Sequence, residues 1–397
     1  MSSVSDTIDL ALPLAGDAPL LPGDEFHRLM RALREEAAMA TVSFLGAPCR
    51  IVTRYAELDA AFRDDEGFPA GPTYATTIEP CQGVTFESLD GPEHHLLRAL
   101  TTRELRARPI ERYAERHVGA IADRVIDDLL AESDGGTDLV ATFTKRFPFL
   151  VFGHRMGLPE DRADEYHRWS FDLLGYPGDN ATGLAAAAEL TAYIEPVLAE
   201  RRGCPADDMI SSMVTAEKDG RTLDDEEIRS HVRAIFAAGA ATTHHGIGNT
   251  LYSLLSHPEA LERLRADPTL VPAAVDEMLR WEPPLGVLPR IAPFDTVVAG
   301  EEVPAGTFVL MGIASANRDP AVHDDPDRFD IDRRPARVLT FGFGSHHCPG
   351  THLAKAQIVI GIRHLLERLP RLELADPVAA QPSGAVMRGP RTLPVEF

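Results

Sequence analysis

The segment that decides the fold prediction is Phe341-Gly342-Phe343-Gly344-Ser345-His346-His347-Cys348-Pro349-Gly350. Its glycines allow backbone conformations with positive φ, so the segment can form a tight loop that holds Cys348 with its sulfur pointing outward. Backbone N–H groups of such a loop would stabilise a thiolate, and the N-terminus of a helix predicted over residues 351–366 would add to that effect. The loop therefore predicts a cysteine thiolate that is suited to binding a metal.

Two other interpretations of this cysteine stay open. Zinc could be bound by Cys348 together with neighbouring histidines, although structural zinc takes four ligands and the chain has no second pair at zinc-finger spacing. A buried and unreactive thiol is the ordinary expectation for a lone cysteine. The candidate zinc partners are His346, His347 and His352.

The composition of the whole chain is that of a globular protein. Of the 397 residues, 44% are hydrophobic and 25% are charged, which excludes a disordered or collagen-like chain. The 61 acidic residues exceed the 39 Lys and Arg residues, and the net charge of −22 argues against nucleic acid or an anionic membrane as the main partner. The four cysteines form no CxxC pair, which favours the reducing cytoplasm.

Helical periodicity dominates the chain, and no repeat or low-complexity linker divides it. We therefore expect one domain over residues 1–397, mainly α with small β-sheets, in which residues 1–30 form an N-terminal lead-in without a signal peptide. No segment has the roughly 20 apolar residues of a membrane helix. Helices are predicted over residues 110–131, 184–202, 223–256, 258–267 and 270–281, and strands over residues 40–44, 50–53, 296–298 and 307–311.

The helix predicted over residues 223–256 is long enough to cross the whole domain, at about 50 Å. A capping box of Thr222 and Asp225 is expected to begin it. Its apolar stripe is interrupted in the middle by Gly239 and Thr242. Either a flat ligand lies against that gap, or the small residues allow another helix to cross closely.

The cysteine loop, taken with the rest of the chain, resembles the cytochrome P-450 family, and specifically its bacterial, soluble branch. The resemblance implies the family fold, a single large helical domain with small sheets and a long central helix over the haem. It also implies haem b as the cofactor, with the Cys348 thiolate as axial ligand. The signature F-x-x-G-x-[HR]-x-C-x-G is matched at Phe341, Gly344, His346, Cys348 and Gly350.

Two further motifs follow the order that is typical of the family. An E-x-x-R motif occurs at Glu277 and Arg280, and the resemblance implies that both form a buried structural network with Arg333. The segment Asp90-Gly91-Pro92-Glu93-His94-His95-Leu96-Leu97-Arg98 matches the family's D-x-P-E-H-x-x-x-R. Buried haem propionates need charge-assisted partners. The residues expected to bind them are His94, Arg98, Arg290 and His346.

The middle of the long helix is similar to the family's oxygen-side motif A-G-x-[DE]-T-[TS]. Gly239 and Thr242 are present, but Ala241 replaces the acid that precedes the threonine. In the family, this acid and threonine deliver protons during oxygen activation. Water, His244 or His245, or the substrate must therefore be considered as the proton source, and a peroxide-using enzyme becomes an alternative.

The resemblance implies a monooxygenase that inserts one oxygen atom from O2 into a small hydrophobic, aromatic or terpenoid molecule. Hydroxylation, dealkylation and epoxidation are the expected reactions. Aromatic side chains at Phe68, Tyr74, Phe86, Phe171 and Tyr176 could hold such a skeleton. The residues expected to line the substrate pocket are Phe236, Ala237, Ala240, Val287, Leu288, Val386 and Met387.

Electrons must come from separate proteins, because the chain leaves no room for a flavin or iron–sulfur module beside the haem domain. Residues 98–117 carry six arginines against three glutamates. This segment is either a docking patch for a ferredoxin, itself reduced by a NAD(P)H-dependent reductase, or a helix with ordinary i,i+4 Glu/Arg pairs. A monomer is expected. A haem sensor or carrier without turnover, and a zinc protein, are the remaining alternatives.

Overall fold

The predicted mainly α fold is confirmed by the computed structural model, which describes residue 10 and residues 21–333 and 337–397. Most of the expected N-terminal lead-in lies outside the described residues. The α-helices are α1 (Asp24–Glu36), α2 (Tyr55–Arg63), α3 (Gly71–Thr77), α4 (Glu79–Gln82), α5 (Gly91–Thr101), α6 (Ala107–Tyr113), α7 (Gly119–Ala131), α8 (Phe147–Met156), α9 (Tyr166–Leu174), α10 (Asn180–Gly203), α11 (Met209–Val214), α12 (Asp225–Leu255), α13 (Pro258–Ala266), α14 (Val271–Trp281), α15 (Ile313–Ala316) and α16 (Thr351–Arg368).

Shorter helical turns and strands connect these helices. The 3-10 turns are η2 (Phe86–Ser88), η3 (Arg103–Leu105), η6 (Ala163–Glu165), η7 (Pro268–Leu270) and η8 (Leu339–Phe341), and the π turns are η4 (Ala114–Val118) and η5 (Val140–Thr144). The strands are β1 (Met39–Phe44), β2 (Ala47–Val52), β3 (Gly136–Asp138), β4 (Glu217–Lys218), β5 (Arg221–Thr222), β6 (Leu288–Ile291), β7 (Thr296–Val298), β8 (Glu301–Val303), β9 (Phe308–Met311), β10 (Glu373–Leu374), β11 (Pro382–Ser383), β12 (Gly389–Pro390) and β13 (Pro394–Glu396).

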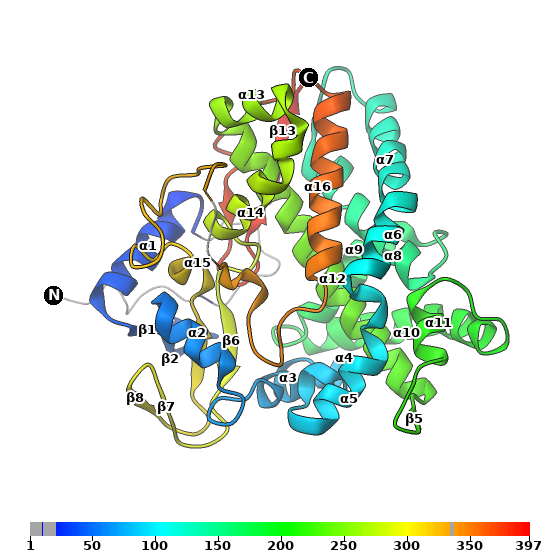
Figure 1. Ribbon diagram of the computed structural model, residues 1–397, viewed down its shortest axis with the longest axis vertical. Helices are drawn as coiled ribbons and strands as arrows, with labels where there is room; N and C mark the ends of the chain where they lie inside the picture. Colours follow the sequence, from blue (N-terminus) through cyan, green and yellow to red (C-terminus); the bar gives the residue numbers. More distant parts are fainter. Residues whose placement is uncertain (1–9, 11–20, 334–336) are drawn as a thin grey trace.

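The helices and the largest sheet occupy different parts of the molecule. Figure 1 shows α16 standing beside α7, with α12 behind them, while β1, β2 and β6 lie on the other side with α1 and α2. Helix α12 packs against α8, α9 and α16. It is therefore the central helix, as predicted, and most of its circumference is covered by other elements.

The beginning of α12 differs from the prediction. The capping box is formed by Asp224 and Glu227, each of which accepts a hydrogen bond from the other's backbone N–H, at 2.8 and 2.9 Å. The predicted box of Thr222 and Asp225 is wrong, because Thr222 pairs with Glu217 in the β4–β5 hairpin. The buried Leu223 then separates the hairpin from the helix cap.

The largest sheet has four strands in the order β1-β2-β9-β6, and only β2 and β9 run parallel. Alternate side chains point to opposite faces of a strand. Ile51 and Leu310 accordingly join a hydrophobic cluster with α1, while Val52 and Val309 join a second cluster with α2. Because both of its faces are covered, the sheet holds its edge strand β6 rigidly. Arg290 of β6 pairs there with Val309 of β9.

Candidate functional site

The cysteine loop is a set of tight turns between η8 and α16. The backbone N–H of Cys348 donates to Phe341 O at 2.9 Å, and Thr351 Oγ1, at the start of α16, donates to Cys348 O at 2.9 Å. Gly344 has a φ of +76°, and a Cβ there would lie 2.5 Å from Phe62 O. Glycine is therefore required at this position, for both backbone conformation and space.

A cavity lies between this loop and α12. Cys348, Phe341 and Gly350 line it from the loop, and Gly239 and Thr242 line it from α12. Burial raises the pKa of the Cys348 thiol, while the Gly350 N–H, the Arg98 guanidinium and Thr351 lower it. The structure thus places the predicted metal ligand and the predicted oxygen-side residues on walls of one cavity.

Three of the four expected propionate ligands, Arg98, Arg290 and His346, also line this cavity. The fourth, His94, is fully buried behind them, with its ring centroid 4.1 Å from that of His346. Arg98 donates to His347 O, and Arg290 donates to the Tyr74 hydroxyl at 3.2 Å. Burial lowers the pKa of His94, and the neighbouring His346 lowers it further. The chain therefore gathers two guanidinium groups and an imidazole at the cavity wall.

The predicted substrate pocket is partly wrong. Leu288 lines the cavity, but Phe236, Ala237 and Ala240 do not, because all three are fully buried in the main hydrophobic core. The Phe236 ring contacts Tyr166 at 5.3 Å between centroids, and Ala237 O accepts a hydrogen bond from Ser170 Oγ. The residues of α12 that do line the cavity are Ile235, Ala238, Gly239, Thr242 and Thr243.

The other predicted pocket residues serve the framework of the site. Val287 is fully buried in the cluster under α1, and Val386 packs against the same cluster. Met387 pairs with Leu285, and it is Leu285 rather than Met387 that lines the cavity. Of the five aromatic candidates, Phe68, Tyr74 and Phe86 line the cavity, whereas Phe171 and Tyr176 do not.

In the oxygen-side segment of α12, Ala241 rather than an acid precedes Thr242. Thr242 Oγ1 donates to Ala238 O at 2.9 Å, and Ala241 is fully buried away from the cavity. His244 is buried and His245 is half-buried, both rings contact Phe171, and neither lines the cavity. Burial lowers the pKa of His244, and it lowers the pKa of His245 to about 3. These two histidines are therefore neutral near pH 7 and unsuited to supplying a proton to the cavity.

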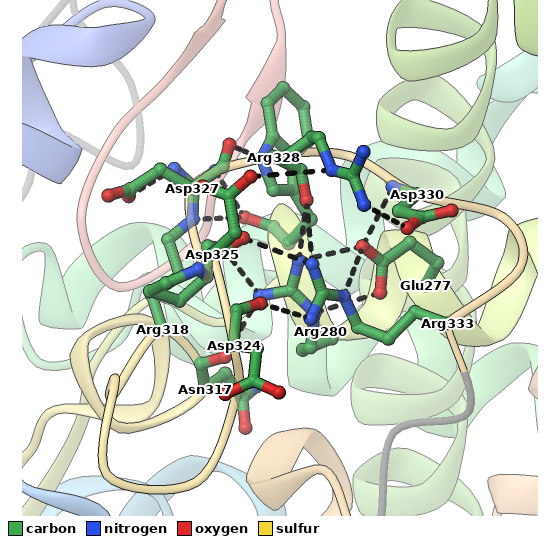
Figure 2. Close-up of polar contacts among 12 residues, drawn as sticks. Glu277, Arg280, Asn317, Arg318, Asp324, Asp325, Asp327, Arg328, Asp330 and Arg333 are labelled. Carbon is green, nitrogen blue, oxygen red and sulfur yellow. Dashed lines mark hydrogen bonds and ion pairs between the residues drawn. The ribbon is translucent and has the colours of Figure 1, made fainter.

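Glu277, Arg280 and Arg333 meet in one polar network, as Figure 2 shows, and none of the three lines the cavity. The Arg280 guanidinium donates two hydrogen bonds to the Glu277 carboxylate, at 2.7 and 2.8 Å, and Arg333 Nε lies 3.2 Å from the same carboxylate. Arg280 also donates to the backbone carbonyls of Asn317 and Pro326. The network therefore ties α14 to the segment that precedes the cysteine loop.

A family model described as Cytochrome P450 matches residues 171–393. This match covers more than half of the chain and includes both the cysteine loop and α12. The chain belongs to the cytochrome P450 family. The predictions of a P450 fold, of a haem cofactor with a cysteine thiolate ligand and of a P450 monooxygenase are thereby confirmed.

Individual relatives agree with this assignment. The chain is 35% identical over 361 residues to mycinamicin IV hydroxylase/epoxidase of Micromonospora griseorubida, covering 88% of this chain and 90% of the relative. It is 36% identical to cytochrome P450 monooxygenase PikC of Streptomyces venezuelae, covering 78% and 74% of the two chains. The solved P450 structure of PksS from Bacillus subtilis 168 superposes with a TM-score of 0.83 at 29% identity, covering 94% of this chain and 98% of that one.

The residues present fit the haem of the P450 family. A thiol, two guanidinium groups and an imidazole, which are the donor types suited to an iron porphyrin with two carboxylates, line one cavity with largely apolar walls. Within the described residues, no group of three or more His, Cys, Asp or Glu side chains could hold another metal ion. Nor does any described helix of this P450 have the length and hydropathy needed to cross a membrane.

The polar residues of the cavity wall that sequence reasoning missed include Glu87, Asp65 and Gln357. Asp65 accepts a hydrogen bond from Ser345 Oγ at 2.9 Å, whereas no described residue bonds to the Glu87 carboxylate. Glu87 lies in the short η2 turn, directly after the aromatic candidate Phe86. A single acid in such a turn has no periodic signal, so only the fold reveals its position.

Proposed function

We propose that Cys348 is the axial thiolate ligand and that this P450 inserts one oxygen atom from O2 into a small hydrophobic organic substrate. The observation that carries the proposal is the placement of Cys348 and Thr242 on one largely apolar cavity, with Arg98 and Arg290 in its wall. When bound, the haem supplies the electron transfer and oxygen activation that no side chain provides. We further infer that the whole chain acts as one monomeric domain in the cytoplasm.

The side chains around the cavity have distinct roles in this proposal. Arg98, Arg290 and His346 hold the haem carboxylates, and His94 fixes His346 from behind. The Thr242 hydroxyl, which can donate and accept a hydrogen bond, would hold a water in the cavity and pass on a proton. Since Ala241, His244 and His245 cannot renew that proton, it comes from water or from the substrate.

The substrate lies against an apolar and aromatic wall. Phe68, Phe86 and Leu288 supply that wall in the cavity that Thr242 also lines. The printed names of the relatives include a hydroxylase/epoxidase and a C-12 hydroxylase. These names support hydroxylation or epoxidation as the reaction of this chain, with dealkylation as the third expected type.

A ferredoxin is proposed as the electron donor, docked on the surface beside Cys348. The basic segment is not one helix, since α5 ends at Thr101 and α6 begins only at Ala107. In the described part of the chain, the exposed Arg106, Arg108 and Arg112 form no ion pair, so the alternative of i,i+4 Glu/Arg pairing does not hold for them. Arg106 also lines a surface groove together with Cys348.

Isotope labelling tests the proposed reaction directly. A library of hydrophobic compounds is first screened for binding through the spin-state shift of the haem, and hits are incubated with ferredoxin, reductase, NAD(P)H and 18O2. We expect one 18O atom in the product that the native protein forms, and no labelled product with Cys348→Ser. Product that forms without label from 18O2 would overturn the proposal.

A peroxide-using enzyme is the second candidate, because α12 has a buried alanine where the family usually has an acid. Hydrogen peroxide supplies its own oxygen and protons, so this reaction needs neither the acid nor the ferredoxin. Incubation of the same hits with 18O-labelled hydrogen peroxide and no reductase measures it. Labelled product from peroxide but not from O2 would favour this candidate over the first.

A further inference from the structure

The loop that carries Glu87 is held rigidly against α5 and α12. Phe86 N donates to His231 Nε2 of α12 at 3.1 Å, and His94 Nδ1 of α5 lies 2.6 Å from Phe86 O. Thr85 and Ser88 close a capping box around η2. Because Phe86 and Ser88 are buried on either side, the Glu87 side chain is fixed on the cavity wall.

The carboxylate of Glu87 has charged neighbours but no bonded partner. Burial raises the pKa of Glu87 to about 7, although Arg98 and Arg290 lower it. Neither arginine, nor any other described residue, forms a hydrogen bond or ion pair with this carboxylate, and both arginines donate to other oxygen atoms. In the proposed function these arginines are further engaged by the haem carboxylates. Glu87 is thus a cavity acid that has no hydrogen-bonded or ion-paired partner among the described residues.

We propose that Glu87 is a specificity residue that selects substrates carrying a cationic nitrogen, such as a protonated amine. An unpaired carboxylate in an apolar cavity is costly, and a substrate cation removes that cost while forming a charge-assisted contact. The apolar wall of Phe68 and Leu288 then holds the hydrocarbon part of the same molecule. This inference rests on the proposed monooxygenase function and names its substrate class.

Three twelve-carbon probes that differ in charge test the inference: dodecyltrimethylammonium, dodecan-1-ol and dodecanoate, each below its critical micelle concentration. The ammonium nitrogen has no lone pair, so it cannot bind the iron directly. Calorimetry on the haem-loaded protein gives each affinity for the native chain and for Glu87→Gln. Asp65→Asn is the matched control, because Asp65 lines the same cavity but is already bonded to Ser345.

We expect Glu87→Gln to weaken binding of the ammonium probe by about tenfold or more, to leave the alcohol unchanged and to strengthen binding of dodecanoate. Asp65→Asn should keep the native order of affinities. Equal affinity of native and Glu87→Gln protein for the ammonium, or an equal loss for all three probes, would overturn the inference. A native protein that lacks the thiolate-type spectrum under carbon monoxide would instead overturn the proposed function.

Discussion

At the scale of single residues, the hydroxyl of Thr242 has the clearest expected role. It faces the cavity without the acid that usually accompanies it. We predict that Thr242→Ala lowers the product formed per NAD(P)H consumed and raises the fraction of electrons lost to peroxide. Thr250→Ala is the matched control, because Thr250 makes the same bond to the carbonyl four residues earlier but does not line the cavity. Equal coupling in both variants would contradict a role for Thr242.

The Glu277–Arg280 pair makes a prediction about stability rather than turnover. Both side chains are fully buried, and removal of one partner leaves an uncompensated charge. We predict that Arg280→Met destabilises the protein by about 3–5 kcal/mol in urea unfolding.

The exposed pair of Arg263 and Asp332 is the control for this measurement, and Arg263→Met should destabilise the protein far less, because water screens this pair. Similar losses in the two variants would show that the buried network contributes no special stability.

At the scale of elements, the broken basic segment around α6 is predicted to guide the electron donor. Arg106 and Arg112 are exposed and unpaired among the described residues, so their attraction for an acidic protein is long-range and screened by salt. Arg106→Glu with Arg112→Glu should slow ferredoxin-driven reduction and flatten its salt dependence. Stopped-flow absorbance measures this rate, and the spin-state titration should stay unchanged. An unchanged reduction rate would mean that these arginines are ordinary solvated surface residues without a role in docking.

Helix α12 illustrates what sequence pattern can and cannot predict about an element. Its length and central position follow from the long periodic segment and from the small residues Gly239 and Thr242. The pattern does not predict which side of the helix faces the cavity, because apolar residues are buried around most of its circumference. The pattern therefore predicts Phe236 and Ala240 as pocket residues, although both are buried in the core and do not line the cavity. The cysteine loop was predictable because all its determinants are contiguous.

At the scale of the whole molecule, buried histidines predict how stability depends on pH. Burial lowers the pKa of four of them to about 4 and that of His245 to about 3. The unfolded chain, in which histidine has its ordinary pKa of about 6.5, binds protons at a pH where the folded chain does not. Stability is therefore highest above pH 6.5 and is lost as the pH falls toward 4. The four with a pKa near 4 are His27, His167, His231 and His323.

Urea unfolding between pH 7.5 and pH 5 measures this effect. His231→Gln should make the free energy of unfolding less dependent on pH, since one group no longer titrates differently in the two states. A pH dependence that is identical in the variant would contradict the contribution of this histidine.

The central claim is that Cys348 holds the haem as a thiolate, and one spectrum tests it most directly. The purified protein is reduced under carbon monoxide and its absorbance is compared with that of Cys348→Ser at equal haem content. The proposed site predicts the thiolate-type band in the native protein and its loss in the variant. The control Cys204→Ser, which changes an exposed cysteine distant in sequence, should keep the band. A thiolate-type band that persists in Cys348→Ser would contradict the assignment.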